Sequence, residues 1–521
     1  MTLTSVGYAL FFALVAILYF ALPKRFQNGV LLAASVVFYC FNLPGAELAD
    51  GSARPLWLRL LPLAVLAFNV VFTFFVARAI GAAKDARRKQ LLALGVCVSV
   101  AVLCFFKYCN FFLPTLFGFT AVSFPLPLGI SFYTFAVISY LVDVYYKATE
   151  PETNFLNWAL FVSFFATITS GPICRAQKVL PQLREPRRFD AQRTCDAFRL
   201  ILAGLFKQIA VANVLGLFVN QVFENSADYS GLILPLAAAL YVIQLYFEFS
   251  GYSDIARGCV MLLGIDIPVN FKTPLFSTNF STLWKRWHIS LSSWLQDYLF
   301  TPIVWSRWGD HLPRVTQKNG KKEAKPFVAT VGIVFFISGF WHGNTWPFVI
   351  WGLLQGLYRV GEDLLHSWYR KPPKRPSLPV RMGKIAVVFV LWAASHVFFR
   401  IGLVSGGTVG DCLHYFANSF TDLSLSHFVS SFVTAVGNGF YTRPIMVVGW
   451  CVYMAAVLAI GVYADWRQCF KMKDAHWSTG LAKLPLAARW LCYYVLIGCI
   501  LVGFIMQSGG FGTVSFAYAN F

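Results

Sequence analysis

The sequence predicts an all-α protein that crosses a membrane many times, and three observations lead to that prediction. Apolar residues make up 58% of the 521 residues and aromatic residues 17%, which is more apolar surface than a water-soluble domain buries. Charged residues make up only 13%, against a usual ~25%. Apolar stretches close to the ~20 residues of a membrane-crossing helix recur along the whole chain. A soluble enzyme and a disordered chain are therefore excluded.

The apolar stretches set the expected number of spans. They cover residues 6–22, 29–43, 56–80, 91–117, 128–146, 155–173, 198–222, 232–249, 327–341, 346–360, 385–399, 445–462 and 491–506. Basic residues at 24–25 and 84–89 flank the first and third stretches, so we expect the amino terminus to face outward. Strict alternation would then place the basic segment 175–188 outside, so at least one earlier segment re-enters or lies flat. We expect about eleven full spans.

Charge is distributed as in a membrane protein. Lys and Arg number 43 and Asp and Glu 23, a net charge of +20. The basic residues form short clusters between apolar runs, so positive-inside bias explains them and a nucleic-acid partner is not expected. Residues 307–325 and 370–384 are further cytoplasmic candidates, and residues 405–443 are expected to form an extracytoplasmic loop or an interfacial helix.

Neither a soluble domain nor a cleavable leader is recognisable in the sequence. The run 6–22 ends in Pro23 and basic residues without a small-residue cleavage site, so it is expected to remain as a span. The 12 cysteines are scattered without a C-x-x-C pair, and no metal site is predicted. We expect one membrane domain over residues 1–521, with its motif-bearing core at about 125–356 and flanking helices at 1–124 and 357–521.

The first candidate for chemistry is a break between two apolar runs. Gly339, Gly343 and Pro347 interrupt the pattern around Trp341, His342 and Asn344. Broken backbone at membrane depth is tolerated only where protein or a water-filled cavity covers it, and an ionisable group there indicates a functional site. His342 is therefore expected to line a cavity and to take a proton. The alternative is a buried histidine bonded to a backbone carbonyl.

The second candidate is the segment 284–298. On a single helix its tryptophans would share one face, while Lys285, His288 and Ser292 would follow one another on another face. Together with Arg286, these cations suit a phosphate-bearing ligand. The alternative is an ordinary interfacial helix with tryptophan anchors.

Two further polar clusters favour structural roles. Residues 248–254 place two carboxylates close to Arg257, as in an ion-pair network. Residues 127–135, followed by Asp143, are rich in hydroxyl groups within one apolar helix, as in helix packing.

The order of these clusters resembles the membrane-bound O-acyltransferase family and, within it, the bacterial alginate O-acetyltransferase-like branch. The matching segments are 126–135, 139–145, 170–173, 180–183, 249–254, 284–292 and 339–343. The resemblance covers residues 125–356 strongly and the flanks by hydropathy.

The resemblance implies a ring of tilted helices around a central tunnel, and it also implies site residues. His342 matches the catalytic histidine of the family, and His288 matches a second position that is usually Asn or His. We expect the donor and substrate to be bound by Lys285, Arg286, Ser292, Asn344 and Trp341. No bound cofactor or metal is expected, because a thioester is already activated and needs only a base and an oxyanion donor.

The function expected from the resemblance is O-acyl transfer at the bacterial inner membrane. The donor would be a cytosolic thioester, acetyl-CoA or an acyl carrier protein, and the acceptor a hydroxyl of an extracytoplasmic polysaccharide or of an exported esterase-like partner. D-alanyl transfer to teichoic acid is an alternative within the enzyme class, and a secondary transporter is one outside it. General-base catalysis and an acyl-histidine intermediate both remain open.

Overall fold

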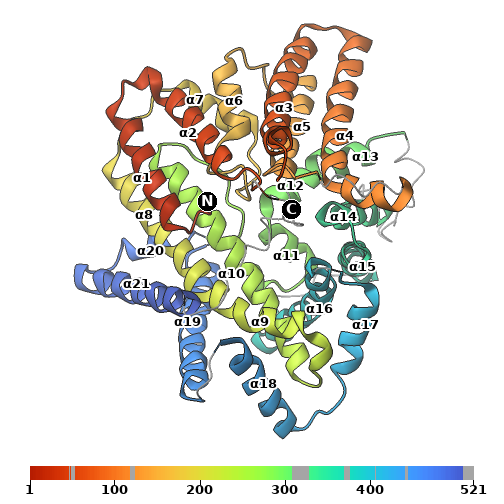
Figure 1. Cartoon of the computed structure of the whole chain (residues 1–521), viewed down its shortest axis with the longest axis vertical. Coiled ribbons are helices and arrows are strands. Elements are labelled where there is room, and N and C mark those ends of the chain that lie inside the picture. Colours follow the sequence, from red (N-terminus) through yellow and green to blue (C-terminus); the bar gives the residue numbers. More distant parts are fainter. Residues whose placement is uncertain are drawn as a thin grey trace. The chain divides into compact units, whose positions relative to one another are not determined.

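The protein is helical throughout the part of the chain that the structure describes. The computed structural model describes residues 1–45, 47, 53–117, 124–307, 328–368, 376–404, 406–440, 444–473 and 475–508 (Figure 1). Within these ranges the only β feature is an isolated antiparallel bridge between Glu47 and Ala53. The predicted all-α fold class is confirmed.

The chain divides into two compact units, which are described separately. The first comprises residues 1–201 and 252–269, and the second comprises residues 202–251 and 270–520. Helices α8 (Ala191–Leu205) and α10 (Ile233–Leu262) contribute residues to both. All of the candidate site residues named above belong to the second unit.

The first unit is built from the amino-terminal helices. They are α1 (Val6–Ala21), η1 (Lys24–Phe26), α2 (Gln27–Phe41), α3 (Leu56–Ala82), α4 (Asp85–Phe117), α5 (Ile130–Tyr145), α6 (Phe155–Ser163) and α7 (Ala176–Arg184). Helices α3, α4 and α5 lie side by side (Figure 1). Helix α5 begins directly after Gly129, which has φ 70° and lies so close to the Ile168 carbonyl that a side chain would overlap it. Only glycine fits there.

The second unit holds the remaining helices. They are η2 (Phe206–Asn213), α9 (Val214–Glu224), η3 (Ser226–Asp228), η4 (Pro274–Phe276), α11 (Phe280–Arg286), α12 (Ile289–Leu295), η5 (Gln296–Phe300), α13 (Thr301–Val304), α14 (Val328–His342), α15 (Trp346–Trp368), α16 (Leu378–Leu403), α17 (Val409–Asn418), α18 (Leu425–Phe440), α19 (Pro444–Phe470), α20 (Ser478–Leu481) and α21 (Leu486–Ser508). Helix α15 packs against both α14 and α16. These three helices carry His342 and the aromatic residues around it.

The helices have the lengths and compositions of a polytopic membrane protein. Seven of those described are long and apolar enough to cross a bilayer: Leu56–Ala82, Asp85–Cys109, Ala191–Glu224, Ile233–Leu262, Leu378–Leu403, Ile445–Phe470 and Leu486–Gln507. Four shorter apolar helices accompany them: Val6–Ala21, Ile130–Tyr145, Ala329–His342 and Leu425–Gly437. The predicted polytopic helical class agrees with this set; seven described helices are candidate spans where about eleven full spans were expected, and the four shorter ones fall below spanning length.

One predicted apolar stretch does not form a single helix. Within residues 155–173, helix α6 ends at Ser163 and turns follow. Nine helical residues extend only about 14 Å, less than half of a ~30 Å hydrocarbon core. This is consistent with the expectation that a segment before the basic residues 175–188 does not cross.

Parts of the predicted loops lie outside the described residues. These are 308–325 of the first basic loop and 370–375 of the second. Within 405–443, the structure has the two helices α17 and α18.

Candidate active site

The hairpin of α14 and α15 holds His342 at its tip. A side chain at Gly339 would place its Cβ 2.5 Å from the Phe348 carbonyl oxygen, and one at Gly352 would lie 2.5 Å from the Phe335 carbonyl oxygen. The two backbones therefore pack directly against each other, as small residues allow in membrane helices. At Gly343 an added Cβ would lie 2.3 Å from the Phe348 ring. The predicted break is confirmed, since α14 ends at His342 and α15 begins at Trp346.

His342 lies in an aromatic enclosure. Its side chain is buried, and its ring centroid is 4.6 Å from that of Trp341, 5.0 Å from Trp351 and 5.2 Å from Phe399. Helix α15 supplies Trp351 and α16 supplies Phe399. Three helices thus fix the plane and position of the imidazole. A group held in this way is oriented before any substrate binds.

A second histidine, His396 of α16, shares this enclosure and was not predicted. Its ring centroid is 5.8 Å from those of Trp351 and Phe399. Its Nδ1 lies 2.8 Å from the Trp392 carbonyl oxygen, and because a carbonyl only accepts, Nδ1 carries the proton and the neutral ring has its lone pair on Nε2. The sequence did hold a signal, namely a histidine within an apolar stretch.

Three buried polar atoms on α15 and in the turn before it have no partner among the described residues. These are the indole Nε1 of Trp351, the side-chain oxygen of Gln355 and the hydroxyl of Thr345. The Gln355 amide nitrogen donates to the Ser395 hydroxyl at 2.7 Å, which fixes its side chain. A buried N–H without an acceptor is costly unless a ligand supplies one. The Trp351 indole is therefore a candidate donor to a substrate.

The segment 284–298 is not the single helix that its pattern predicts. Helix α11 ends at Arg286, Trp287 continues in an extended conformation, and α12 begins at Ile289. Between them His288 has φ 42° and ψ 53°, the left-handed region. The cause is Asn270, whose backbone and side-chain oxygens accept from the first two amides of α12, those of Ile289 (2.9 Å) and Ser290 (3.1 Å). The predicted succession along one face is therefore wrong.

The same contacts orient His288. The Asn270 side-chain oxygen accepts from the Ser290 amide, so the amide orientation is fixed. His288 Nδ1 lies 3.2 Å from that oxygen and must donate to it. Complete burial lowers the pKa of His288 to about 3. The ring is thus neutral at physiological pH and presents the lone pair of Nε2.

Two of the predicted donor-binding residues meet at a cavity of about 480 Å³. Lys285 and Ser292 line it together with Trp284 of α11 and the apolar residues Val331 and Phe335 of α14. The Lys285 ammonium contacts no carboxylate of the described chain. The cavity thus combines an apolar wall with one uncompensated cation.

The other predicted donor-binding residues are placed differently. The Arg286 guanidinium donates to the Thr273 hydroxyl at 3.0 Å and approaches the Cys469 sulfur at 3.2 Å, so it ties α11 to other segments. Asn344 is exposed in the turn after α14, and Trp341 is buried beside His342. The structure therefore groups Trp341 with His342, and Lys285 with Ser292.

A series of aromatic ring contacts connects the surroundings of His342 to those of His288. From the His342 enclosure it passes through His396 to Trp392, at 5.1 Å, and from Trp392 to Trp287, at 4.7 Å. Trp287 directly precedes His288 in the sequence. The two predicted histidines thus belong to one continuous aromatic core of the second unit.

The third polar cluster contains the expected ion pair. In the first unit, Arg257 lies 3.8 Å from Asp254.

Comparisons with known proteins identify the family of this chain. The family model described as MBOAT, membrane-bound O-acyltransferase family, matches residues 90–401, a range that contains both predicted histidines and His396. The chain is 33% identical over 367 residues to the probable alginate O-acetylase AlgI of Azotobacter vinelandii, covering 68% of this chain and 67% of that protein.

Relatives with other names are also similar. The chain is 30% identical over 481 residues to the peptidoglycan O-acetyltransferase of Helicobacter pylori, covering 85% and 83% of the two chains. It is 29% identical over 252 residues to the teichoic acid D-alanyltransferase of Streptococcus thermophilus, covering 47% of this chain and 58% of that protein. Family membership decides between the enzyme and the transporter that the sequence left open. The chain is a multi-pass membrane O-acyltransferase and belongs to the membrane-bound O-acyltransferase family.

Proposed function

We propose that the protein transfers an acetyl group from a cytosolic thioester to a hydroxyl of an extracytoplasmic polysaccharide, or of a partner protein that acetylates one. The main supporting observation is His342, fixed at a break between two apolar helices beside the Trp351 indole N–H, which has no acceptor among the described residues. The names of the alginate and peptidoglycan O-acetylating relatives support a polysaccharide as the final acceptor. The seven candidate spans among the described helices of this chain fit the bacterial inner membrane.

In the proposed reaction His342 acts as the base. It takes the proton of the acceptor hydroxyl while the oxygen attacks the thioester carbon. The resulting oxyanion accepts a hydrogen bond from Trp351 Nε1, and the thiolate leaves and recovers the proton from the imidazolium. The products are an ester and a free thiol, so no metal or redox group takes part in the scheme.

The cavity beside Lys285 is the proposed place for the donor. A thioester of acetyl-CoA or of an acyl carrier protein carries phosphate on a long, flexible arm, and an exposed ammonium next to an apolar wall suits both ends of such an arm. His288 is proposed to orient the donor through the lone pair of Nε2. In this scheme Arg286 and Trp341 act in support from α11 and α14, and Asn344 does so from the turn between α14 and α15.

The test is acyl transfer by purified protein from a radiolabelled thioester, compared among single variants. His342→Gln should lower the rate at least ~10²-fold, the low end for the loss of a general base. Trp351→Phe, which removes the N–H and keeps an aromatic ring, should lower kcat about 10²- to 10³-fold.

Trp450→Phe is the matched control. Trp450 is also buried with its indole Nε1 lacking a partner among the described residues, but its ring packs on Phe218 and Phe432. Its replacement should leave the rate unchanged. Equal losses of rate in Trp351→Phe and Trp450→Phe would contradict the oxyanion role of Trp351. Normal activity in His342→Gln would contradict the role of His342 as the base.

D-alanyl transfer is the second candidate, because teichoic acid D-alanyltransferases match nearly half of the chain. The donor is identified by comparing the rates of transfer from acetyl-CoA, an acetylated carrier protein and a D-alanylated carrier protein in parallel assays. Label that stays on denatured protein and is absent from His342→Gln would indicate an acyl-histidine intermediate rather than direct transfer.

A further inference from the structure

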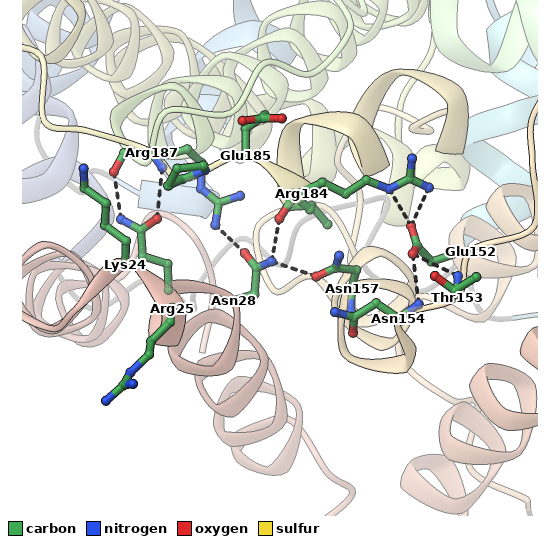
Figure 2. Close-up of a pocket in the computed structure, with 13 residues that line it drawn as sticks. Lys24, Arg25, Asn28, Glu152, Thr153, Asn154, Asn157, Arg184, Glu185 and Arg187 are labelled. Atoms are coloured by element: carbon green, nitrogen blue, oxygen red, sulfur yellow. Dashed lines mark hydrogen bonds and ion pairs between the residues drawn. The ribbon is translucent and has the colours of Figure 1, made fainter.

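A second polar cavity lies in the first unit, and none of the site residues assigned above lines it. It has a volume of about 400 Å³ and is assembled from three short segments around the start of α2, the start of α6 and the end of α7. Its lining is almost entirely polar (Figure 2): Lys24, Arg25, Gln27, Asn28, Glu152, Thr153, Asn154, Asn157, Leu183, Arg184, Glu185, Pro186 and Arg187.

Arg187 brings a buried positive charge to this cavity. The side chain is only 7% exposed. Its guanidinium donates to the Tyr19 hydroxyl at 2.5 Å, to the Gln182 carbonyl oxygen at 3.0 Å and to the Asn28 side-chain oxygen. All three acceptors are neutral, so no carboxylate of the described chain balances the charge. Since a guanidinium has five N–H donors, two remain for a ligand.

The acidic residues of the cavity do not neutralise this charge. Glu152 is buried and accepts from Arg184 Nε at 3.1 Å and Nη2 at 2.9 Å. Its other oxygen accepts from the amides of Thr153 and Asn154, each at 3.0 Å. Glu152 is thus fully engaged, while the Glu185 carboxylate extends away from the network (Figure 2). The Glu152–Arg184 pair contributes no net charge.

Lys24 adds a second uncompensated cation. It is exposed, forms no ion pair with a carboxylate of the described chain, and extends along the same side of the cavity as Arg187 (Figure 2). Arg25 points in the opposite direction and stacks on the Phe26 ring at 4.8 Å. A cavity with two unbalanced cations and spare N–H donors is suited to a phosphate group.

Exposed apolar side chains lie close in sequence to the basic residues. Leu22 and Phe26 flank Lys24 in the sequence, and Phe189 follows Arg187 by two positions; all three are exposed. Residues 24–25 and 175–188 are among the basic segments that charge bias assigns to the cytoplasmic side. A phosphate site at that boundary, with an apolar surface beside it, matches the headgroup and acyl chains of a phospholipid.

We propose that this cavity binds the phosphate of an anionic phospholipid of the cytoplasmic leaflet, with the lipid chains lying along the exposed apolar residues of α1 and η1. Arg187 and Lys24 hold the phosphate, and the Glu152–Arg184 pair keeps the cavity open by fixing the end of α7 to the start of α6. The site is independent of the proposed acyl transfer.

The test uses the full-length protein in a neutral detergent and native mass spectrometry of bound lipid. Phosphatidylglycerol is the probe, phosphatidylcholine with the same chains is the neutral-headgroup comparison, and inorganic phosphate is the free anion. Phosphatidylglycerol should bind at least tenfold more tightly than phosphatidylcholine. Lys24→Glu should weaken its binding about 30-fold, because the local charge changes by two units and each basic charge is worth roughly fivefold.

Lys84→Glu is the matched control. Lys84 is an exposed lysine between α3 and α4, within another basic segment assigned to the cytoplasmic side, and it does not line the cavity. This variant should change the affinity less than twofold. Lys24 is exposed and forms no hydrogen bond or ion pair with another described side chain, so its replacement should leave the fold intact, whereas Arg187 connects several segments and is left in place.

Three results would overturn the proposal. Equal affinities for the two lipids would exclude the proposed preference for an anionic headgroup, since phosphatidylcholine carries the same phosphate balanced by an ammonium. Equal losses in Lys24→Glu and Lys84→Glu would show that the effect is one of general charge. Displacement of the lipid by inorganic phosphate at a matching affinity would assign the cavity to a free phosphate-bearing ligand instead.

Discussion

Replacing Gly339, near the tip of the α14–α15 hairpin, with alanine should lower activity far more than it lowers stability. The added Cβ would lie 2.5 Å from the Phe348 carbonyl oxygen and 3.0 Å from the Gly352 Cα, both backbone atoms that cannot rotate away. Restoring ordinary contact distances requires the helices to separate locally by about 0.9 Å. His342 follows Gly339 by less than one helical turn, so the imidazole moves with the backbone.

The size of the effect differs between stability and rate. Overpacking costs about 1–3 kcal/mol, and the better helix propensity of alanine returns about 1 kcal/mol, so the thermal midpoint should fall by only a few degrees. A displacement of about 1 Å at a catalytic group is worth about 10²-fold in rate. Acyl transfer should therefore fall about 100-fold in a protein that still folds.

Gly332→Ala is the matched control, since Gly332 lies on the same helix and an added Cβ there meets nothing within 4 Å. It should keep the normal rate and be as stable as the parent or slightly more stable. The measurements are the initial rate of acyl transfer and thermal unfolding in the same detergent. A normal rate in Gly339→Ala would refute the argument that backbone contact at this point positions His342.

Further predictions concern the remaining site residues. Because burial lowers the pKa of His288 to about 3, the folded chain binds fewer protons than the unfolded chain below about pH 6.5. Between pH 7.5 and pH 5 the parent should therefore lose about 2 kcal/mol more stability than His288→Asn. Parallel curves of stability against pH for the two proteins would show that the ring is not held neutral. Lys285→Gln should raise the KM for the thioester roughly tenfold with little change in kcat, and an unchanged KM would remove the lysine from the donor path. Arg286→Gln should instead lower the thermal midpoint, because its guanidinium contacts Thr273 and Cys469; a lower affinity for donor without loss of stability would reverse that assignment. A cysteine at Asn319 should react with impermeant reagents only from the cytoplasm, and labelling of intact cells would overturn the orientation.

Features set by local chemistry could be predicted from the sequence. The helix break after His342 was predictable because Gly343 and Pro347 interrupt a continuous apolar run, and both residues act on their own backbone. The membrane class followed from composition in the same way. His396 was equally accessible, because a histidine within the apolar stretch 385–399 is exceptional by the same rule that selected His342.

Features set by contacts distant in sequence could not be predicted. The pattern of 284–298 favours one helix, and the interruption at His288 comes from Asn270, which is 18 residues earlier and stabilises the first turn of α12. The lipid cavity is likewise assembled from residues around 24–28, 152–157 and 183–187. No hydrophobic period connects such segments, and only the folded chain brings their charges together.

The left-handed backbone at position 288 limits which side chains can be accepted there, whatever the reaction requires. Most L-residues are strained at φ 42°, while asparagine, aspartate and histidine are tolerated better and glycine best. Valine, isoleucine and threonine would strain the junction between α11 and α12 regardless of polarity. Which substitutions are tolerated at position 288 therefore depends first on the main-chain conformation and only second on the need for an imidazole. Asparagine separates the two, since it suits the same backbone without a titratable ring.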